Sequence, residues 1–182
     1  TAESLFVAGH GQTGLGIAYP YVADQMRGAY VDVPDLMTRS HPVLTAQDAR
    51  DYISRLAALP DAIDDERRRL YADASAGVIA PDFILRRMAV LATEMGQGPA
   101  ETHILVATLD SLLSGPEDLS AEERDRLALR ARALVEDEIL PAYARFADDL
   151  ISLATKAPSQ PGVWQLPNGD AYYDASLAAY TY

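Results

Sequence analysis

The residues best suited to contact a small molecule lie near the C-terminus, in the run Trp164-Gln-Leu-Pro-Asn-Gly-Asp-Ala-Tyr-Tyr173. This run joins the only tryptophan to a Pro-Asn-Gly turn and two adjacent tyrosines. Successive residues on a helix diverge by about 100°, so one of Tyr172 and Tyr173 can pack inward while the other faces a cleft. A tyrosine hydroxyl can donate to a substrate carbonyl or carboxylate. Spacing alone favours a simpler interpretation, a turn followed by a packed helix.

A second pattern, at residues 5–14, reads as a nucleotide-binding motif. Gly9, Gly11 and Gly14 spell G-x-G-x-x-G after an apolar run, and Asp32 lies about 20 residues further on. The motif works only where a strand leads into a helix within a parallel sheet. No further strands are predicted downstream, and Pro20 interrupts the segment where the helix would run. We therefore interpret the run as a flexible glycine-rich lead-in.

The three histidines do not form a metal site by themselves. His10, His41 and His103 are not spaced four residues apart, and no H-E-x-x-H motif occurs. His103 comes near the start of a predicted helix, where packing or a surface position is expected. His41 precedes Pro42, which favours extended backbone, and we expect its ring to lock a loop by bonding to nearby backbone.

Carboxylates occur in runs at residues 64–66, 122–123, 136–138 and 148–149. In none of these runs does a second acid or a histidine complete an inward-facing metal set of the Glu-x-x-His kind. The runs are typical of solvated helix faces. The sequence therefore predicts no catalytic residue and no metal ligand within the chain.

The elements that must position these side chains are helices, so the predicted fold class is all-α. Proline and glycine punctuation, capping motifs and 3.6-residue apolar spacing predict helices over residues 45–59, 60–77, 81–96, 99–115 and 120–153. Pro141 is expected to kink or split the last of these. A Pro-rich connector and a short Tyr-rich helix fill residues 157–182. Residues 1–44 are predicted to be an irregular Gly/Pro-rich lead-in whose extended segments lie over the helical scaffold of residues 45–156.

Composition limits the possible partners. The chain has 182 residues, 49% of them hydrophobic, which suits a single domain. Its 15 basic and 27 acidic residues give a net charge of -12, which argues against nucleic acid and against anionic membrane surfaces. No apolar run is long enough to span a bilayer. The absence of cysteine excludes disulfides and thiolate metal sites, and the compartment stays open, either cytoplasmic or exported with a leader removed.

Two stretches together resemble the N-terminal part of the bacterial domain of unknown function 885 family. The first runs from Tyr19-Pro20 to Gly28, then through Pro34-Asp-Leu-Met, His41-Pro42 and Asp48–Leu56 to Gly77–Phe83. The second is Gly162–Tyr173, continuing to Leu177-Ala-Ala-Tyr-Thr181. The W-x-L-P-x-G-x-x-Y-Y pattern is the more specific of the two. The resemblance implies a zinc metallopeptidase of mostly helical, gluzincin-like fold.

In that family the H-E-x-x-H helix lies downstream of the part that this chain resembles. The resemblance thus implies an N-terminal region that lacks metal ligands, with zinc expected in the complete enzyme. Trp164, Tyr172 and Tyr173 would help to wall a cleft for a peptide-like substrate. The expected partners are the rest of the same polypeptide or a second copy, packed on exposed apolar helix faces. The alternative is a stand-alone acidic helical interaction module without catalysis.

Overall fold

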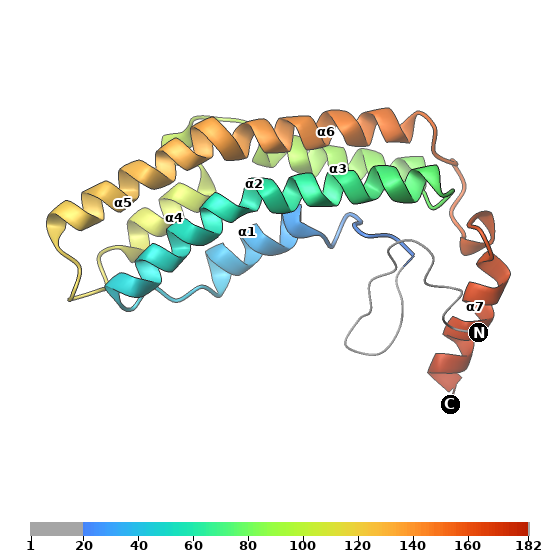
Figure 1. Ribbon diagram of the computed structural model, residues 1–182, viewed down its shortest axis with the longest axis horizontal. Coiled ribbons are helices and arrows are strands. Elements are labelled where there is room, and N and C mark those ends of the chain that lie inside the picture. Colours follow the sequence, from blue (N-terminus) through green and yellow to red (C-terminus); the bar gives the residue numbers. More distant parts are fainter. Residues whose placement is uncertain (1–19, 182) are drawn as a thin grey trace.

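The computed structural model describes residues 20–181 and contains helices without strands over that range (Figure 1). The α-helices are α1 (Ala29–Arg39), α2 (Ala46–Ser75), α3 (Asp82–Met95), α4 (Ile104–Leu112), α5 (Ala121–Leu134), α6 (Leu140–Ala154) and α7 (Gly169–Thr181). Two short 3-10 turns occupy Ala100–Thr102 and Val163–Gln165, and a π-helical segment occupies Val135–Ile139. The predicted all-α fold class is confirmed. The glycine-rich run at residues 5–14 and His10 lie outside the described residues.

Helices α1–α6 form one bundle, called here the helical body. Helix α6 packs mainly on α3 and also on α2, while α1 lies against α2 and α4. In Figure 1, α5 and α6 follow one another along one side of the body, with α2 running beside them. Helix α7 projects past the end of the bundle and packs chiefly on the turn at residues 163–165. No helix among residues 20–181 is long and apolar enough to cross a membrane.

The body buries one continuous apolar core. Its largest fully buried side chains come from five of the six helices and include Tyr30, Tyr52, Leu105, Tyr143 and Phe146. The rings of Tyr30 and Phe146 lie 5.0 Å apart between centroids, which joins α1 to α6. Burial of large aromatic and aliphatic side chains is the main stabilising contribution in a bundle of this size.

The start of α2 confirms the capping signal read from the sequence. The Thr45 hydroxyl accepts a hydrogen bond from the Asp48 amide at 3.2 Å, and the Asp48 carboxylate accepts from the Thr45 amide at 2.9 Å. This reciprocal pair is a complete capping box. At the start of α5, the Ser120 hydroxyl accepts from the Glu123 amide, but the Glu123 carboxylate bonds instead to Arg50.

The prediction that a new helix begins at Pro60 is wrong. Helix α2 runs unbroken for 30 residues, with Pro60 buried in its interior. The apolar stripe continues without a phase change from Leu56 and Leu59 to Ile63 and Leu70, all of which are buried. Packing along this stripe outweighs the single backbone hydrogen bond that proline removes.

The prediction of an irregular lead-in over residues 1–44 is wrong for residues 29–39, which form α1, whereas residues 20–28 and 40–44 lie in no helix or strand. Pro34 lies inside this helix, so the Tyr30 carbonyl loses its usual partner four residues ahead. The Tyr143 hydroxyl of α6 donates to that carbonyl at 2.6 Å. A tertiary contact thus replaces the missing helical bond.

The long helical pattern of residues 120–153 is interrupted just before Pro141. The five residues Val135–Ile139 form a π-helical segment between α5 and α6, and Pro141 falls in the first turn of α6. Proline is tolerated there because it has no N–H to donate and the first turn needs none. The expected interruption near Pro141 is present as a change of helical winding.

Candidate functional site

The run that contains Trp164 folds into a compact turn that leads into α7. The Leu166 amide donates to the Val163 carbonyl at 3.0 Å, and the Gly169 amide donates to the Leu166 carbonyl at 2.9 Å. Asn168 adopts φ 56°, the left-handed conformation that asparagine tolerates better than most residues. The Pro-Asn-Gly turn predicted from the sequence is therefore present.

Two glycines make this turn possible. Gly162 has φ 144°, and a Cβ atom there would overlap the Trp164 indole, so the ring lies directly on the Gly162 backbone. A Cβ atom at Gly169 would lie 2.7 Å from the Val163 carbonyl carbon and 2.8 Å from the Trp164 Cα. The start of α7 can approach the 163–165 turn this closely only because both positions lack a side chain.

The three predicted cleft residues differ in exposure. Trp164 is 65% exposed and Tyr173 is 58% exposed, whereas Tyr172 is half-buried. Burial, together with the nearby Tyr172, raises the pKa of Tyr21, and Tyr21 itself packs against the core of the body. The two adjacent tyrosines thus diverge as helical geometry requires. Their role in a cleft stays a prediction.

Beside this turn lies a cavity of about 310 Å³, called here the Lys156 pocket. Three separate segments line it: the start of the described chain, the α2–α3 connection, and residues 156–166. The residues that define it are Tyr21, Ile79, Pro81, Lys156, Gln160 and Leu166. It lies next to the Gly162 backbone on which the Trp164 indole rests.

The chemistry of the Lys156 pocket favours binding over bond breaking. Its described lining offers an ammonium, a phenol and the amides of Gln160 and Gln165, and it contains no carboxylate or histidine. The side-chain amide of Gln165 donates a hydrogen bond to the backbone carbonyl of Gln160, which orients the Gln165 side chain. These groups are hydrogen-bond donors, and none is paired with a general base.

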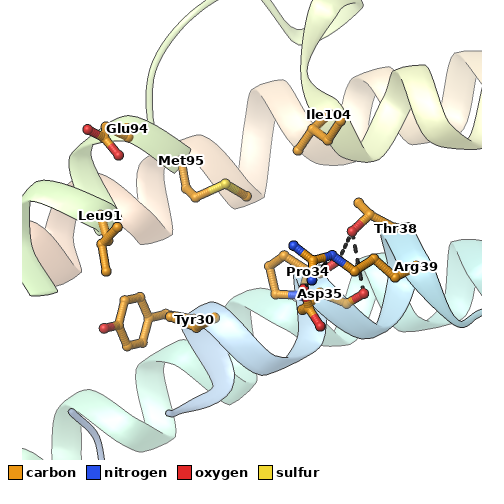
Figure 2. Close-up of a pocket in the computed structure, with 10 residues that line it drawn as sticks. Tyr30, Pro34, Asp35, Thr38, Arg39, Leu91, Glu94, Met95 and Ile104 are labelled. Carbon is orange, nitrogen blue, oxygen red and sulfur yellow. Dashed lines mark hydrogen bonds and ion pairs between the residues drawn. The ribbon is translucent and has the colours of Figure 1, made fainter. Parts of the chain in front are cut away.

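A second hollow lies between α1 on one side and α3 with α4 on the other, and we call it the α1–α3 groove. It measures about 320 Å³ and is lined mainly by apolar side chains: Tyr30, Val31, Pro34, Leu91, Met95 and Ile104. Figure 2 shows Leu91 and Met95 of α3 opposite Tyr30 and Pro34 of α1. The groove exists because α1 packs on α2 and α4 but makes few contacts with α3.

The rim of the α1–α3 groove is polar, and its polar side chains from α1 are already paired. Asp35 and Arg39 form an exposed ion pair at 2.9 Å. The Thr38 hydroxyl donates to the Pro34 carbonyl at 2.8 Å, along the dashed line drawn in Figure 2. The groove therefore suits an apolar group, and Glu94 of α3 adds a carboxylate to its lining.

The prediction that residues 64–66 form a solvated face is wrong at Glu66, whose carboxylate is buried. Glu66 is 7% exposed and accepts hydrogen bonds from the Ala29 amide at 3.0 Å and the Tyr30 amide at 3.5 Å. Burial raises its pKa to about 7, and the two amide bonds offset only part of this. Its carboxylate thus caps α1 from α2. A Cβ on Gly28 would collide with it.

Glu66 could have been found from its spacing. Leu59, Ile63, Glu66, Leu70 and Asp73 fall on one stripe of α2 at intervals of three and four residues, and all five are buried. An acid within a buried stripe signals a partner on a neighbouring helix. For Glu66 that partner is the N-terminus of α1, where partial positive charge and unpaired amides favour a carboxylate.

The two described histidines have structural roles. His103 Nε2 lies 3.0 Å from the Met95 carbonyl, and its Nδ1 accepts from the Leu105 amide at 3.3 Å, so the ring caps α4. Burial lowers the pKa of His103. His41 Nε2 lies 3.3 Å from the Asp48 carbonyl, and its Nδ1 contacts Arg55. Both agree with the predicted packing and loop-locking roles.

Residues 20–181 do not fit a zinc ion. Within that range no group of three or more histidine, aspartate or glutamate side chains lies close enough together to hold a metal. Asp64 of α2 and Asp149 of α6 both pair with Arg67.

The chain matches a known protein family. A family described as "bacterial protein of unknown function (DUF885)" matches residues 3–182, nearly the whole chain. The chain belongs to this family. No curated protein shows a significant match to it.

One solved structure has a closely similar fold. The crystal structure of "the putative lipoprotein from Colwellia psychrerythraea" matches with a TM-score of 0.85 and 26% sequence identity over 92% of this chain. The chain spans 28% of the length of that protein. The helical body with its C-terminal turn therefore corresponds to one part of a longer related polypeptide.

Proposed function

We propose that this chain is the N-terminal helical region of a zinc-dependent, peptidase-like hydrolase, to which it supplies walls of the substrate cleft and no metal ligand. The observation that carries the proposal is the exposed Trp164 beside the Lys156 pocket, in a chain that belongs to the DUF885 family. An exposed tryptophan next to a donor-rich cavity is typical of a binding surface.

Each cleft residue has a defined task in this proposal. The Trp164 indole, held on Gly162, offers a rigid apolar face to a substrate side chain. Tyr173 is exposed on the first turns of α7 and can donate to a substrate carbonyl, while Tyr172 fixes α7 against the body near Tyr21. These residues bind and orient a substrate. Zinc is bound outside residues 20–181, and the described residues move no proton in the reaction.

The test uses the complete polypeptide that contains this chain. We expect the purified protein to carry zinc, to cleave short peptides, and to lose that activity when a chelator removes the metal. Trp164→Ala should lower kcat/KM by about tenfold, the effect of losing one aromatic contact. Leu129→Ala removes a side chain that is 63% exposed on α5 and serves as the matched control. A protein that holds no zinc and cleaves no peptide would overturn the proposal.

The α1–α3 groove favours a second candidate, a helical interaction module without catalysis. Ile104 is 51% exposed at its edge, next to the half-buried Leu91 and Met95. Such a groove can take an apolar side chain of a partner protein or a second copy. Concentration-dependent self-association that Ile104→Asp abolishes, in a complete protein without zinc or hydrolysis, would favour this candidate over the first.

A further inference from the structure

We propose that the Lys156 pocket binds the free carboxylate of a short peptide, with the neighbouring side chain of that peptide against the Trp164 indole. The inference rests on the proposed function and deepens it by naming the substrate class. It predicts preference for peptides with an unblocked C-terminus over longer or capped chains.

The charge of the pocket is the first argument. Lys156 is the only lysine in a chain of net charge -12, and it forms no ion pair with any acid among the described residues. Asp82, whose amide donates to the Pro158 carbonyl at 2.9 Å, forms its own ion pair with Arg86 at 3.8 Å. The ammonium is therefore available to an external anion.

The neighbouring hydrogen-bond donors favour a small carboxylate as the bound anion. Gln160, Gln165 and Tyr21 line the same cavity as Lys156. A planar carboxylate has two oxygens and about four acceptor positions, which an ammonium, an amide and a phenol can satisfy together. Without an arginine in the lining, the pocket lacks the fork that suits a phosphate dianion.

The shape of the cavity sets the length of the ligand. A volume of about 310 Å³ is at the lower end for small-molecule sites and holds one or two residues. Ile79, Pro81, Pro158 and Leu166 form its apolar wall. Gly162 lines the cavity and the Trp164 ring, which is outside the lining, lies on Gly162, so the second-last residue of a bound peptide would extend past Gly162 to the indole.

Trp164 also supplies the measurement, because it is the only tryptophan in the chain. We would titrate the 182-residue chain with tri-alanine, with tri-alanine amide and with acetate, and follow the tryptophan emission. Tri-alanine should change the emission saturably, its amide should bind at least about fivefold more weakly, and acetate should bind more weakly than tri-alanine. Raising the salt concentration should weaken tri-alanine binding.

Two variants test the role of the ammonium. Lys156→Gln should weaken tri-alanine binding about fivefold or more and remove the preference for the free acid, whereas Lys156→Arg should retain most of both. Arg130→Gln, which removes an exposed cation of α5, is the matched control and should bind as the unaltered chain does. Calorimetric titration repeats each measurement without relying on the indole.

Each outcome decides the proposal. Equal affinity for tri-alanine and its amide, unchanged affinity in Lys156→Gln, or no binding in both emission and calorimetry would overturn it. Hydrolysis by the complete protein without carboxylate preference would leave the proposed function intact and defeat this inference alone. Carboxylate binding by the pocket, without any hydrolysis by the complete protein, would leave this inference intact and defeat the proposed function.

Discussion

The helical body and the C-terminal segment, residues 157–181, use their apolar side chains in opposite ways. In the body, Tyr52, Tyr143 and Phe146 are completely buried. In the segment, Leu166 is the only large apolar side chain that is buried among residues 157–178, while Trp164, Tyr173 and Leu177 are more than half exposed. The body uses aromatic surface for its own stability, and the segment leaves aromatic surface available to a ligand.

Their polar groups differ in the same sense. The body buries Glu66, His41 and His103, each with hydrogen-bond partners on a neighbouring element or loop. The segment instead holds its shape by the close approach of backbone at Gly162 and Gly169. The binding surface proposed for this segment needs a rigid support, and the body supplies it.

The largest expected effect is on the free energy of unfolding, which a substitution in the body should lower far more than one in the C-terminal segment. Phe146→Ala removes a fully buried ring from the α6–α1 contact and should lower the free energy of unfolding by about 3–5 kcal/mol. Trp164→Ala should change it by less than about 0.5 kcal/mol, because the ring is mostly exposed. Denaturant unfolding followed by circular dichroism at 222 nm measures both. Equal losses of unfolding free energy in the two variants would contradict the proposed difference between the two regions.

The second prediction concerns pH and Glu66. Burial raises the pKa of Glu66 from 4.5 to about 7 in the folded state. Between these values the folded chain holds more protons than the unfolded chain, so this group makes stability fall as pH rises from about 4.5 to 7. Its contribution to that fall is about 3 kcal/mol. In Glu66→Gln this part of the pH dependence should disappear.

Unfolding at pH 5 and pH 7 by denaturant tests this difference. Glu136→Gln changes an exposed carboxylate of the π-helical segment and should keep the pH dependence of the unaltered chain. The proposed peptide-binding surface should be insensitive to the Glu66 substitution, since Glu66 lies within the body. A pH dependence that is unchanged in Glu66→Gln would contradict the assigned burial.

The smallest expected effect is confined to the C-terminal segment. Gly162→Ala forces a side chain into the space of the Trp164 indole, so we expect the ring to move and its emission to shift. Gly98→Ala is the matched control, because Gly98 also has positive φ (93°) but nothing lies within 4 Å of an added Cβ. Both should cost about 1 kcal/mol of local backbone strain. Only Gly162→Ala should alter the tryptophan emission.

Local signals in the sequence predicted most of the helices. Pro81 and Gly96 bound α3 as expected, and the Thr45–Asp48 pair starts α2 with a full capping box. The interruption near Pro141 followed from the fixed φ of proline and its missing amide hydrogen. Such features depend on a few neighbouring residues, so the sequence states them directly.

The elements that sequence reasoning missed depend on distant residues. Helix α1 contains Pro34 and is only 11 residues long, too short to be stable alone. It forms because Glu66 caps its first turn and Tyr143 donates to the Tyr30 carbonyl, contacts that span 37 and 113 positions in the chain. No local pattern records such contacts.

The candidate site divides in the same way. The Trp164–Gly169 turn and the divergence of Tyr172 and Tyr173 were predictable from residue types and helical spacing. The Lys156 pocket was not, because it needs Tyr21 and Ile79 to meet residues 156–166, and only the packed bundle brings these segments together.

Native-state hydrogen exchange on the 182-residue chain, with and without tri-alanine, tests the central claim most directly. We expect the amides of α2, α3 and α6 to exchange only through global unfolding, and those of residues 163–178 to exchange through local opening. Tri-alanine should slow the local opening of residues 163–166. Because it binds the folded chain alone, it should slow the globally exchanging amides of the body only by its binding free energy. Uniform protection across both regions, or protection by tri-alanine confined to the body, would contradict the account of a stable scaffold that presents a separate binding surface.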